Sequence, residues 1–474
     1  MTELRDILDA QRKAFASQAS PDLGTRLARL DAILSAITRD MDVIVSAMKE
    51  DFGSRSVHEI LMAELFTTVS GIRHIKKHLA GWMEPEKRAV PLVLQRGRAR
   101  LVRQPLGVVG VIAPWNYPFY LAILPMATAL AAGNRVMLKP SELTPRTSDC
   151  MAGLLAGIFP QDLVATVIGG AEVGAAFSAL PFDHLFFTGS TAVGKKVMAA
   201  ASENLTPVTL ELGGKSPALV TPDYPLEKAV HRICAGKFFN AGQTCVAPDY
   251  VLVPAGREEA FAGLAEAVIK KSYPALADNP DYTAIINQGH YNRLLALTRD
   301  AETKGARVIS VNPAGETLAP EGRRMAPTLV LNPDDSMGVM NEEIFGPILP
   351  VEGYADLDEA LAKINARPRP LAFYVFDEDE RRVERILAGT TSGGVCVNET
   401  MLQVAADDLP FGGVGASGMG SYHAREGFLA FSHSRGVFYQ DRINPRSLFG
   451  PPYTKALERL LTLLVKRGTG LWPR

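Results

Sequence analysis

Apolar residues in the first 85 positions recur at steps of three and four, the spacing that places side chains on one face of a helix. A second run with this period, residues 58–82, stops before Pro85, whose ring cannot continue a helix. The next stretch, 92–107, has the character of a β ribbon, with Gly97 between basic residues as its predicted turn. The clearest helical stripe comprises Leu27, Leu30, Ile33, Leu34, Ile37 and Met41.

From Val108 onwards the pattern changes to short apolar runs that each end in Gly, Pro or Ser, such as GVVGVIAP, NRVMLKP, LVATVIGG and HLFFTGS. Helix-length segments, for example 122–132 and 147–158, lie between them. Buried strands that alternate with helices predict βαβ units and a parallel sheet covered on both faces. A second alternation begins near Ser216 and runs to about Asn398. We therefore predict an α/β fold.

Length and composition narrow the class of protein. A chain of 474 residues is too long for one ordinary core, so two or three domains are expected. With 47% hydrophobic residues, 21% charged residues and a net charge of -1, the chain has no electrostatic reason to bind nucleic acid or an acidic membrane. The four cysteines form no CxxC pair, so neither a disulfide framework nor a metal site is predicted.

The two ends of the chain predict a cytoplasmic protein. The N-terminal residues 1–15 are charged and contain no apolar stretch suited to a signal peptide. The most apolar part of the tail, Leu457 to Val465, is interrupted by Glu458 and Arg459. It is far shorter than the roughly 20 apolar residues that a membrane-spanning helix needs.

Two glycine motifs differ in how well their surroundings suit a dinucleotide. The segment 413–418, GVGASG, matches GxGxxG, but no predicted strand precedes it, so we interpret it as a tight structural loop. The segment 189–195, GSTAVGK, lies between a strand and a helix, where glycines let backbone N–H groups approach a pyrophosphate. Lys196 stands where a nucleotide triphosphatase needs a magnesium-binding hydroxyl. A dinucleotide phosphate site and a plain glycine-rich turn both stay open.

A rigid loop is predicted after the strand that begins at Val108. Pro114 and Pro118 hold Trp115 and Asn116 in a non-helical conformation. Loops at the carboxyl ends of parallel strands are where doubly wound sheets bind ligands. A ligand-binding loop and a structural proline turn explain this segment equally well.

Three residues are candidates for catalytic chemistry. Cys245 follows a flexible Gly-Gln-Thr segment, which can present a thiol to a cleft, although most cysteines are inert packing. Its thiol, with an ordinary pKa of about 8.5, would need a nearby base or a positive site for activation. Glu211 ends a β-like segment beside two glycines and can serve as a base toward water, although most glutamates are exposed or ion-paired. Asn116 can donate an amide hydrogen to an oxyanion.

The motifs occur together and in order: APWNYP at 113–118, LKPSE at 138–142, GSTAVGK at 189–195, ELGGKSP at 211–217, FFNAGQTC at 238–245 and EEIFGP at 342–347. Together they resemble the aldehyde dehydrogenase superfamily over nearly the whole chain. The short N-terminal region, the segment 410–433 and the tail LFGPPYTKALERLL are similar to its class 3 branch. Within that branch, QRKAF, DFGSRSVHEILMAE and GIRHIKKHL look most like coniferyl aldehyde dehydrogenases.

The resemblance implies a role for each matched residue. Cys245 would be the nucleophile and Glu211 the base, while Asn116 and the Cys245 backbone N–H would form the oxyanion hole. Lys139 and Glu142 would bind the adenosine ribose. Further cofactor positions are Gly189 and Ser190 at the pyrophosphate, Glu343 and Phe345 at the nicotinamide-side ribose and ring, and Ile112, Ala113, Pro114, Trp115, Ser141, Gly170, Gly174, Thr188, Val193 and Leu212 around them.

The resemblance also implies an organisation. A Rossmann-like NAD-binding domain would comprise residues 1–90 and 107–212, and a catalytic α/β domain residues 213–410. Residues 91–106 and 411–445 would form a small β bridging element that supports a homodimer, and 446–474 a C-terminal tail. Glu142 would repel a 2′-phosphate, which favours NAD, whereas the class 3 resemblance leaves NADP open.

The predicted reaction is oxidation of an aromatic or hydrophobic aldehyde to the acid, and coniferyl aldehyde rests on the resemblance alone. Tyr117, Phe239 and Phe411 would suit a flat or apolar substrate. A medium-chain fatty aldehyde dehydrogenase and a CoA-acylating enzyme are alternatives, and a water-activating Glu211 argues against the latter. Lys196 disfavours a nucleotide triphosphatase, and the presence of all three catalytic candidates disfavours an inactive relative.

Overall fold

Helices make up the N-terminal region, as the apolar spacing predicts. The structure, a computed structural model, describes residues 2–91, 94, 96–442 and 449–466. Leu30, Ile33 and Ile37 of the predicted stripe are buried, whereas Met41 is exposed, because a new helix begins there. The helices are α1 (Thr2–Ser17), α2 (Leu23–Arg39), α3 (Met41–Phe52), α4 (Val57–Ile60) and α5 (Thr67–Met83).

The run predicted as one helix over 58–82 is continuous but contains a π-helical turn. Helix α4 leads directly into this turn, η1 (Leu61–Phe66), and α5 follows it without a break. A π turn has i→i+5 hydrogen bonds, and such turns are frequent at functional sites. Helix α5 ends before Pro85, as predicted.

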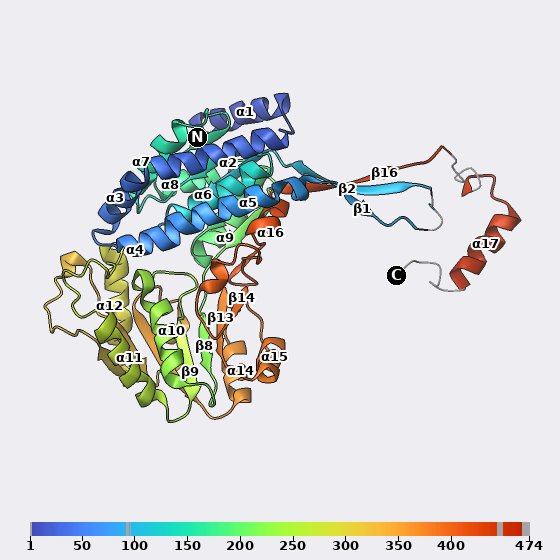
Figure 1. The fold of residues 1–474 in the computed structure, drawn as a ribbon. Helices are drawn as coiled ribbons and strands as arrows, with labels where there is room; N and C mark the ends of the chain where they lie inside the picture. The colour runs from blue at the N-terminus through green and yellow to red at the C-terminus, as the bar shows by residue number, and fades with distance from the viewer. Residues whose placement is uncertain (1, 92–93, 95, 443–448, 467–474) are drawn as a thin grey trace.

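A six-stranded sheet in the order β15-β7-β6-β3-β4-β5 carries the first strand–helix alternation. Neighbouring strands are parallel except β15, which is antiparallel to β7. The strands are β3 (Val108–Ile112), β4 (Arg135–Lys139), β5 (Val164–Thr166), β6 (His184–Thr188), β7 (Val208–Glu211) and β15 (Gly418–Met419). The helices of this first alternation are α6 (Tyr120–Ala131), α7 (Pro145–Ala156), α8 (Ala171–Ser178) and α9 (Thr191–Ser202). Figure 1 shows them beside the N-terminal helices.

A seven-stranded sheet in the order β10-β11-β12-β9-β8-β13-β14 carries the second alternation, and only β10 is antiparallel to its neighbour. The strands are β8 (Pro217–Val220), β9 (Tyr250–Pro254), β10 (Arg307–Ser310), β11 (Thr328–Leu331), β12 (Ile348–Tyr354), β13 (Ala372–Phe376) and β14 (Gly394–Val397). The helices are α10 (Leu226–Phe238), α11 (Glu258–Ser272), α12 (Gln288–Thr303), α13 (Gly338–Asn341), α14 (Leu357–Asn365) and α15 (Glu380–Ala388). In Figure 1 this part lies below the first sheet.

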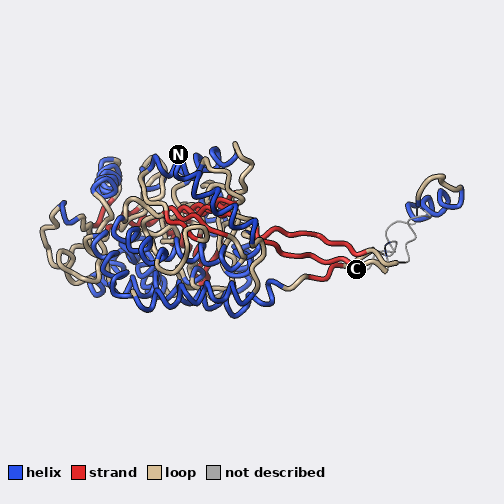
Figure 2. The backbone as a smooth tube through the Cα atoms, turned by 90° about the horizontal axis from the view of Figure 1, so that it is seen from above, coloured by secondary structure: helices blue, strands red, loops and turns tan. Residues whose placement is uncertain are grey.

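A three-stranded arm of β1 (Glu86–Arg88), β2 (Arg98–Pro105) and β16 (Ser432–Tyr439) projects from the body, as Figures 1 and 2 show. Helix α16 (Ala424–Ala430) leads into it, and α17 (Lys455–Lys466) lies apart from the body in both views. The turn is where it was predicted, since Gly97 N donates to Leu94 O at 3.0 Å. The first strand of the ribbon, however, lies at 86–88, before the predicted 92–107.

The α/β fold class is therefore confirmed, with two largely parallel sheets and a small antiparallel arm. The domain boundaries stay a prediction, and positions 92–93, 95, 443–448 and 467–474 of the predicted bridging element and tail lie outside the described residues. Within the described part of the chain, no helix combines the length and apolar character needed to cross a membrane.

Candidate active site

The predicted site segments leave one edge of the first sheet. Strand β6 lies between β3 and β7 and is parallel to both, so the carboxyl ends of the three strands lie together. The loop with Asn116 follows β3, Gly189 follows β6, and Glu211 is the last residue of β7. Cys245 arrives from the other sheet, because it follows α10 and the 3-10 turn η3 (Phe239–Gly242). The site thus forms where the two sheets meet.

A cavity of about 350 Å³ has both Cys245 and Glu211 in its wall. The three aromatic residues predicted for the substrate side, Tyr117, Phe239 and Phe411, also line it. Most of the remaining wall is apolar, and its members include Met62, Leu121, Val246, Met401, Leu402 and Val404.

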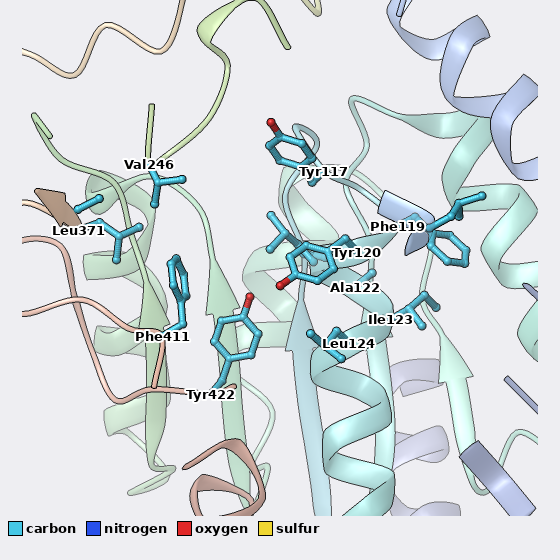
Figure 3. Close-up of a cluster of buried hydrophobic side chains, with 14 of the residues drawn as sticks. Tyr117, Phe119, Tyr120, Ala122, Ile123, Leu124, Val246, Leu371, Phe411 and Tyr422 are labelled. Carbon is cyan, nitrogen blue, oxygen red and sulfur yellow. The ribbon is translucent and has the colours of Figure 1, made fainter. Parts of the chain in front are cut away.

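Aromatic side chains from two parts of the chain face each other in this cavity. Figure 3 shows Phe411 and Tyr422 on one side and Tyr117 and Tyr120 on the other, with the hydroxyls of Tyr120 and Tyr422 pointing toward one another. Phe411 and Tyr422 pack edge to face, with ring centroids 5.9 Å apart. The cavity therefore suits a flat or apolar molecule better than a charged one.

Glu211 is the most unusual polar group in the cavity. The residue is 2% exposed, and neither carboxylate oxygen has a hydrogen-bond partner among the residues that the structure describes. Burial raises the pKa of this carboxyl well above its ordinary value. A buried carboxylate without partners is costly, so its presence beside a thiol marks it as a candidate acid or base.

Cys245 is half-buried, and its surroundings do not favour the thiolate. Burial, followed by the charges of Glu343 and Glu211, raises the pKa of the thiol to about 12. The sequence left two ways to activate the thiol, a positive site and a nearby base. The raised pKa gives no support to a positive site, so a nearby base is needed. All four cysteines are free.

Asn116 is tied to the segment that carries the nucleophile. Its amide Nδ2 donates to Gln243 O at 3.2 Å, and its own carbonyl accepts from Asn240 Nδ2 at 3.1 Å. Next to it, the Tyr117 hydroxyl lies 2.7 Å from Thr244 Oγ1. These bonds hold the loop after β3 against the turn before Cys245, and an amide with two hydrogens keeps one of them for a ligand.

Lys139 and Glu142 form an ion pair at the carboxyl end of β4, with Nζ 2.8 Å from Oε2. The lysine is buried and also donates to Pro140 O, whereas the Glu142 side chain is 43% exposed. A Cβ placed on Gly174 of α8 would lie 3.5 Å from Lys139 Cε, so this helix packs against the stem of the lysine. The pair can present both a donor and an acceptor to hydroxyl groups.

The GSTAVGK segment joins β6 to α9 as predicted. Ser190 caps the helix by accepting from Val193 N at 3.4 Å. A Cβ on Gly189 would lie 2.6 Å from the Phe187 ring, so a side chain at position 189 would displace that ring. Thr188 Oγ1 is buried without a hydrogen-bond partner in the described part of the chain. This helix N-terminus offers backbone N–H groups to an anion.

Glu343 lies against the glycines that follow Glu211. A Cβ on Gly213 would lie 2.0 Å from its Oε2, so a side chain at position 213 would displace the carboxylate. Burial, together with the charge of Asp249, raises the pKa of Glu343 to about 8. Phe345 has a left-handed backbone, with φ of 49°, and its ring meets Trp115 edge to face at 5.4 Å. This contact joins the loop after β3 to the EEIFGP segment.

The other predicted cofactor positions lie around these groups. Ala113 N donates to Lys139 O at 3.0 Å, and Gly170 caps α8. Ser141 is buried, and its hydroxyl accepts from Leu143 N. Of the remaining members, Val193 is exposed, Pro114 is half-buried, and Ile112 and Leu212 are buried. Their contact with a cofactor stays a prediction.

The second glycine motif, 413–418, is a tight loop, as interpreted from the sequence. A Cβ on Gly413 would lie 2.0 Å from Ser417 O, and one on Gly418 would lie 2.1 Å from Leu210 O. Gly418 is paired with Glu211, and Leu212 N donates to Ser417 O at 3.0 Å. The loop therefore fixes the strand that carries Glu211.

Several buried charges around the site were missed from the sequence. Arg55, in the loop between α3 and α4, and Glu59 and Glu64, in the helical run that follows it, are buried. Lys237, directly before FFNAGQTC, is fully buried, its Nζ has no hydrogen-bond partner within the described residues, and burial lowers its pKa to about 8. A helical pattern gives no sign that a charged residue faces inward. Over the described ranges, no three His, Cys, Asp or Glu residues are grouped as a metal site requires.

The aldehyde dehydrogenase family matches residues 2–437 of the chain. The chain belongs to this family. It is also similar to a probable coniferyl aldehyde dehydrogenase of Pseudomonas aeruginosa, with 51% identity over 467 residues that cover 98% of this chain and 97% of the relative. The resemblance read from the motifs is thus confirmed, and the chain is an oxidoreductase of the aldehyde dehydrogenase type.

Solved structures agree with this assignment. The substrate-bound state of Staphylococcus aureus AldH has a TM-score of 0.91 at 37% identity, with 97% of this chain and 99% of that chain covered. An aldehyde dehydrogenase of Mycobacterium tuberculosis, solved in complex with NAD+, has a TM-score of 0.82 at 28% identity, with coverage of 92% and 90%. The arrangement of two sheets around Cys245 is therefore that of the family.

Proposed function

We propose that this aldehyde dehydrogenase uses NAD to oxidise an aromatic or hydrophobic aldehyde to its carboxylic acid, with Cys245 as nucleophile, Asn116 as oxyanion donor and Glu211 as base. The observation that carries the proposal is Glu211. Its carboxylate is buried, lacks partners in the described chain and lines the same cavity as the thiol. Hydrolysis of a thioester needs such a base next to the sulfur.

The first half-reaction begins with attack by the Cys245 sulfur on the aldehyde carbonyl. Because the pKa of the thiol is raised, a base must take its proton, and Glu211 lines the same cavity. Asn116 Nδ2 and the Cys245 backbone N–H then stabilise the alkoxide, at roughly 3 kcal/mol per donor. Loss of hydride from this adduct leaves an acyl thioester on Cys245.

A nicotinamide dinucleotide, when bound, supplies the hydride acceptor. The residues present fit such a group: the N-terminus of α9 with Gly189 and Ser190 offers backbone donors, and Lys139 with Glu142 offers a paired donor and acceptor. Glu343 Oε1 is buried without a partner in the described chain, so it can accept from a ribose hydroxyl. The acidic Glu142 favours NAD over NADP, although the class 3 likeness leaves NADP use open.

The second half-reaction hydrolyses the thioester. Glu211 first releases to solvent the proton that it took from the thiol, and its carboxylate then takes a proton from a water molecule. The water oxygen attacks the acyl carbon, the carbon–sulfur bond breaks, and Glu211 returns the proton to the Cys245 sulfur, which releases the acid and the thiol. The raised pKa of this carboxyl makes its ionised form a stronger base than an exposed glutamate. This water-activating role favours hydrolysis over transfer of the acyl group to CoA.

The apolar cavity and the relative's name support an aromatic substrate such as coniferyl aldehyde. The deciding experiment compares kcat/KM for coniferyl, cinnamyl and benzyl aldehydes with that for hexanal, by NADH absorbance at 340 nm. We expect the cinnamyl type to be preferred. A preference for hexanal would support the medium-chain alternative, and stimulation by CoA would support the acylating one. Cys245→Ala should abolish every activity.

Three further parts of the proposal concern the whole protein. We place the cofactor domain at residues 1–90 and 107–212 and the catalytic domain at 213–410, because all strands of the first sheet except β15 precede residue 213 and the strands of the second sheet lie within 213–410. The projecting arm supports a homodimer, since a sheet with open edges outside the body can pair with a second copy. Light scattering should give twice the mass of one chain. A cytoplasmic location remains in keeping with the four free thiols.

A further inference from the structure

The turn before the nucleophile has a backbone that needs outside support. Asn240 and Ala241 have φ angles of 49° and 51°, in the left-handed region. For Ala241 this conformation costs about 1–2 kcal/mol, whereas asparagine adopts it more readily. Such strain persists only where surrounding contacts fix the geometry. Here the turn determines how Cys245 enters the cavity.

A carboxylate from the N-terminal helices reaches this turn. Glu59, on α4, accepts through Oε2 from Asn240 N at 3.1 Å and from Thr283 Oγ1 at 3.0 Å. Asn240 in turn donates through Nδ2 to Asn116 O and to Gln243 O, at 3.1 and 3.2 Å. One buried carboxylate therefore holds the residue that links the Asn116 loop to the Cys245 segment.

A second carboxylate of the same helical run, Glu64, holds the far end of the Asn116 loop. Glu64 accepts through Oε2 from Phe119 N at 3.1 Å and Tyr120 N at 2.8 Å, at the start of α6 directly after the Asn116 loop. Its Oε1 accepts from Arg55 at 2.8 Å, and both side chains of this pair are fully buried. Arg55 also lies over the Tyr117 ring, 5.2 Å from its centroid.

The π turn explains why both carboxylates point inward. Glu59 and Glu64 are five positions apart. In a regular α-helix, with about 100° per residue, side chains five apart diverge by about 140°. The wider turn η1 (Leu61–Phe66) has i→i+5 bonds, which bring such positions toward one face. Its Met62 and Ala63 line the cavity.

We propose that Glu59 is a positioning residue for aldehyde oxidation: it fixes the Asn240 turn and, through it, the placement of Cys245 relative to Asn116. The proposal rests on the functions proposed for those two residues. A purely structural Glu59 would affect the fraction of folded protein, whereas a positioning residue affects the folded enzyme's reactivity. Separate measurements of the folded fraction and of the folded enzyme's reactivity therefore distinguish the two roles.

The test replaces Glu59 in the full chain by leucine, which keeps similar volume but cannot accept a hydrogen bond. At a temperature where circular dichroism shows the variant folded, we expect Glu59→Leu to lower kcat and the rate of Cys245 alkylation by iodoacetamide by about 10- to 100-fold, as misplacement of a reacting group does. KM for NAD should change less than about twofold, because Glu59 bonds to Asn240 and Thr283, neither of which is proposed to hold the cofactor.

Two variants serve as controls. Glu59→Gln retains an acceptor oxygen for Asn240 and Thr283, so we expect near-complete rescue. Gln11→Leu removes a buried side chain that bonds to Val136 O and Gln161 O, away from both loops. It should lower the melting temperature and leave kcat and alkylation unchanged.

The proposal is overturned if Glu59→Leu behaves like Gln11→Leu, with stability lost and reactivity kept. Should Glu59→Leu fail to fold, Glu59→Asp provides the test, because it keeps the charge but withdraws the carboxylate from Asn240. Unchanged kcat and alkylation in Glu59→Asp would then overturn it. If the proposed function itself were wrong, Cys245→Ala would keep its turnover. This outcome differs from those that overturn the role of Glu59.

Discussion

The two sides of Cys245 differ in what they offer a ligand. On the substrate side, the cavity wall is aromatic and aliphatic, and Glu211 has no protein partner in the described chain. On the side proposed for the cofactor, polar groups dominate, and they are already paired or placed by glycines: Lys139 with Glu142, and Glu343 against Gly213. On this proposal, shape selects the aldehyde, whereas oriented charges and backbone donors select the dinucleotide.

Glu211→Gln, at the boundary of the two sides, should have the largest effect. The amide cannot accept a proton from water, so acyl-enzyme accumulates and steady turnover falls by about 10²–10⁴-fold. Stopped-flow absorbance at 340 nm should show a burst of NADH without steady production, and the burst should be slower than in the wild type because Glu211 also takes the proton of the Cys245 thiol. Fast continued turnover would remove Glu211 from the role of base.

The same carboxyl gives the wild type a pH dependence. Burial raises the pKa of Glu211 in the folded enzyme, and only its ionised form accepts a proton. As pH falls through this raised value, kcat should therefore fall, well above the pH at which an exposed glutamate would be protonated. Rate profiles of the single-turnover deacylation step measure this directly. A deacylation rate that stays level down to pH 5 would contradict the assignment.

Asn116→Ala should come next, because it removes one donor to the oxyanion. We expect kcat to fall by about 10²–10³-fold. The variant also loses the bond to Gln243 O, so alkylation of Cys245 by iodoacetamide is the control for displacement of the thiol. A negligible loss of kcat would mean that the oxyanion is stabilised by other groups.

Lys139→Met tests the cofactor side alone. The methionine fills similar volume but cannot donate, and a charge-assisted hydrogen bond is worth about 1.5–3 kcal/mol. KM for NAD should therefore rise by about 10- to 100-fold, while kcat at saturating NAD and KM for the aldehyde change little. A matching rise in KM for the aldehyde would show that the two sides are not separable.

Phe411→Ala tests the substrate side and should have the smallest effect. Loss of one aromatic face, worth about 0.5–1.5 kcal/mol, should lower kcat/KM for cinnamyl aldehyde by about 2- to 12-fold. The value for hexanal should change less, and KM for NAD should not change. Leu409→Ala, in the same loop but not in the cavity wall, is the matched control.

Much of this site could be predicted from the sequence, because its residues lie in short local motifs. Strand ends followed by glycine or proline placed Gly189, Glu211 and the Asn116 loop at one edge of a parallel sheet, and the structure brings them there. Tyr117 and Phe239 were expected near the site because they belong to these motifs, and the structure places both in the cavity wall.

What escaped prediction depends on contacts between distant segments. Glu59 and Glu64 lie in a run that looks like a regular amphipathic helix, and no local signal marks the π turn that directs them inward. The sequence also left open whether a base or a positive site lies near Cys245, because the charges that act on its thiol come from Glu343 and Glu211, which are distant from it in the chain. A pKa depends on neighbours in space, which spacing along a sequence does not give.

The pairing of Gly418 with Glu211 has a consequence for the newly made protein. The ribosome delivers Glu211 long before the residues that close the open edge of its strand, and domains fold in the order in which they emerge. Until β15 pairs with it, the outer edge of β7 has open backbone groups at Glu211. A chain that stops before Gly418 would therefore hold the Cys245 thiol but lack the strand that fixes the backbone of the proposed base.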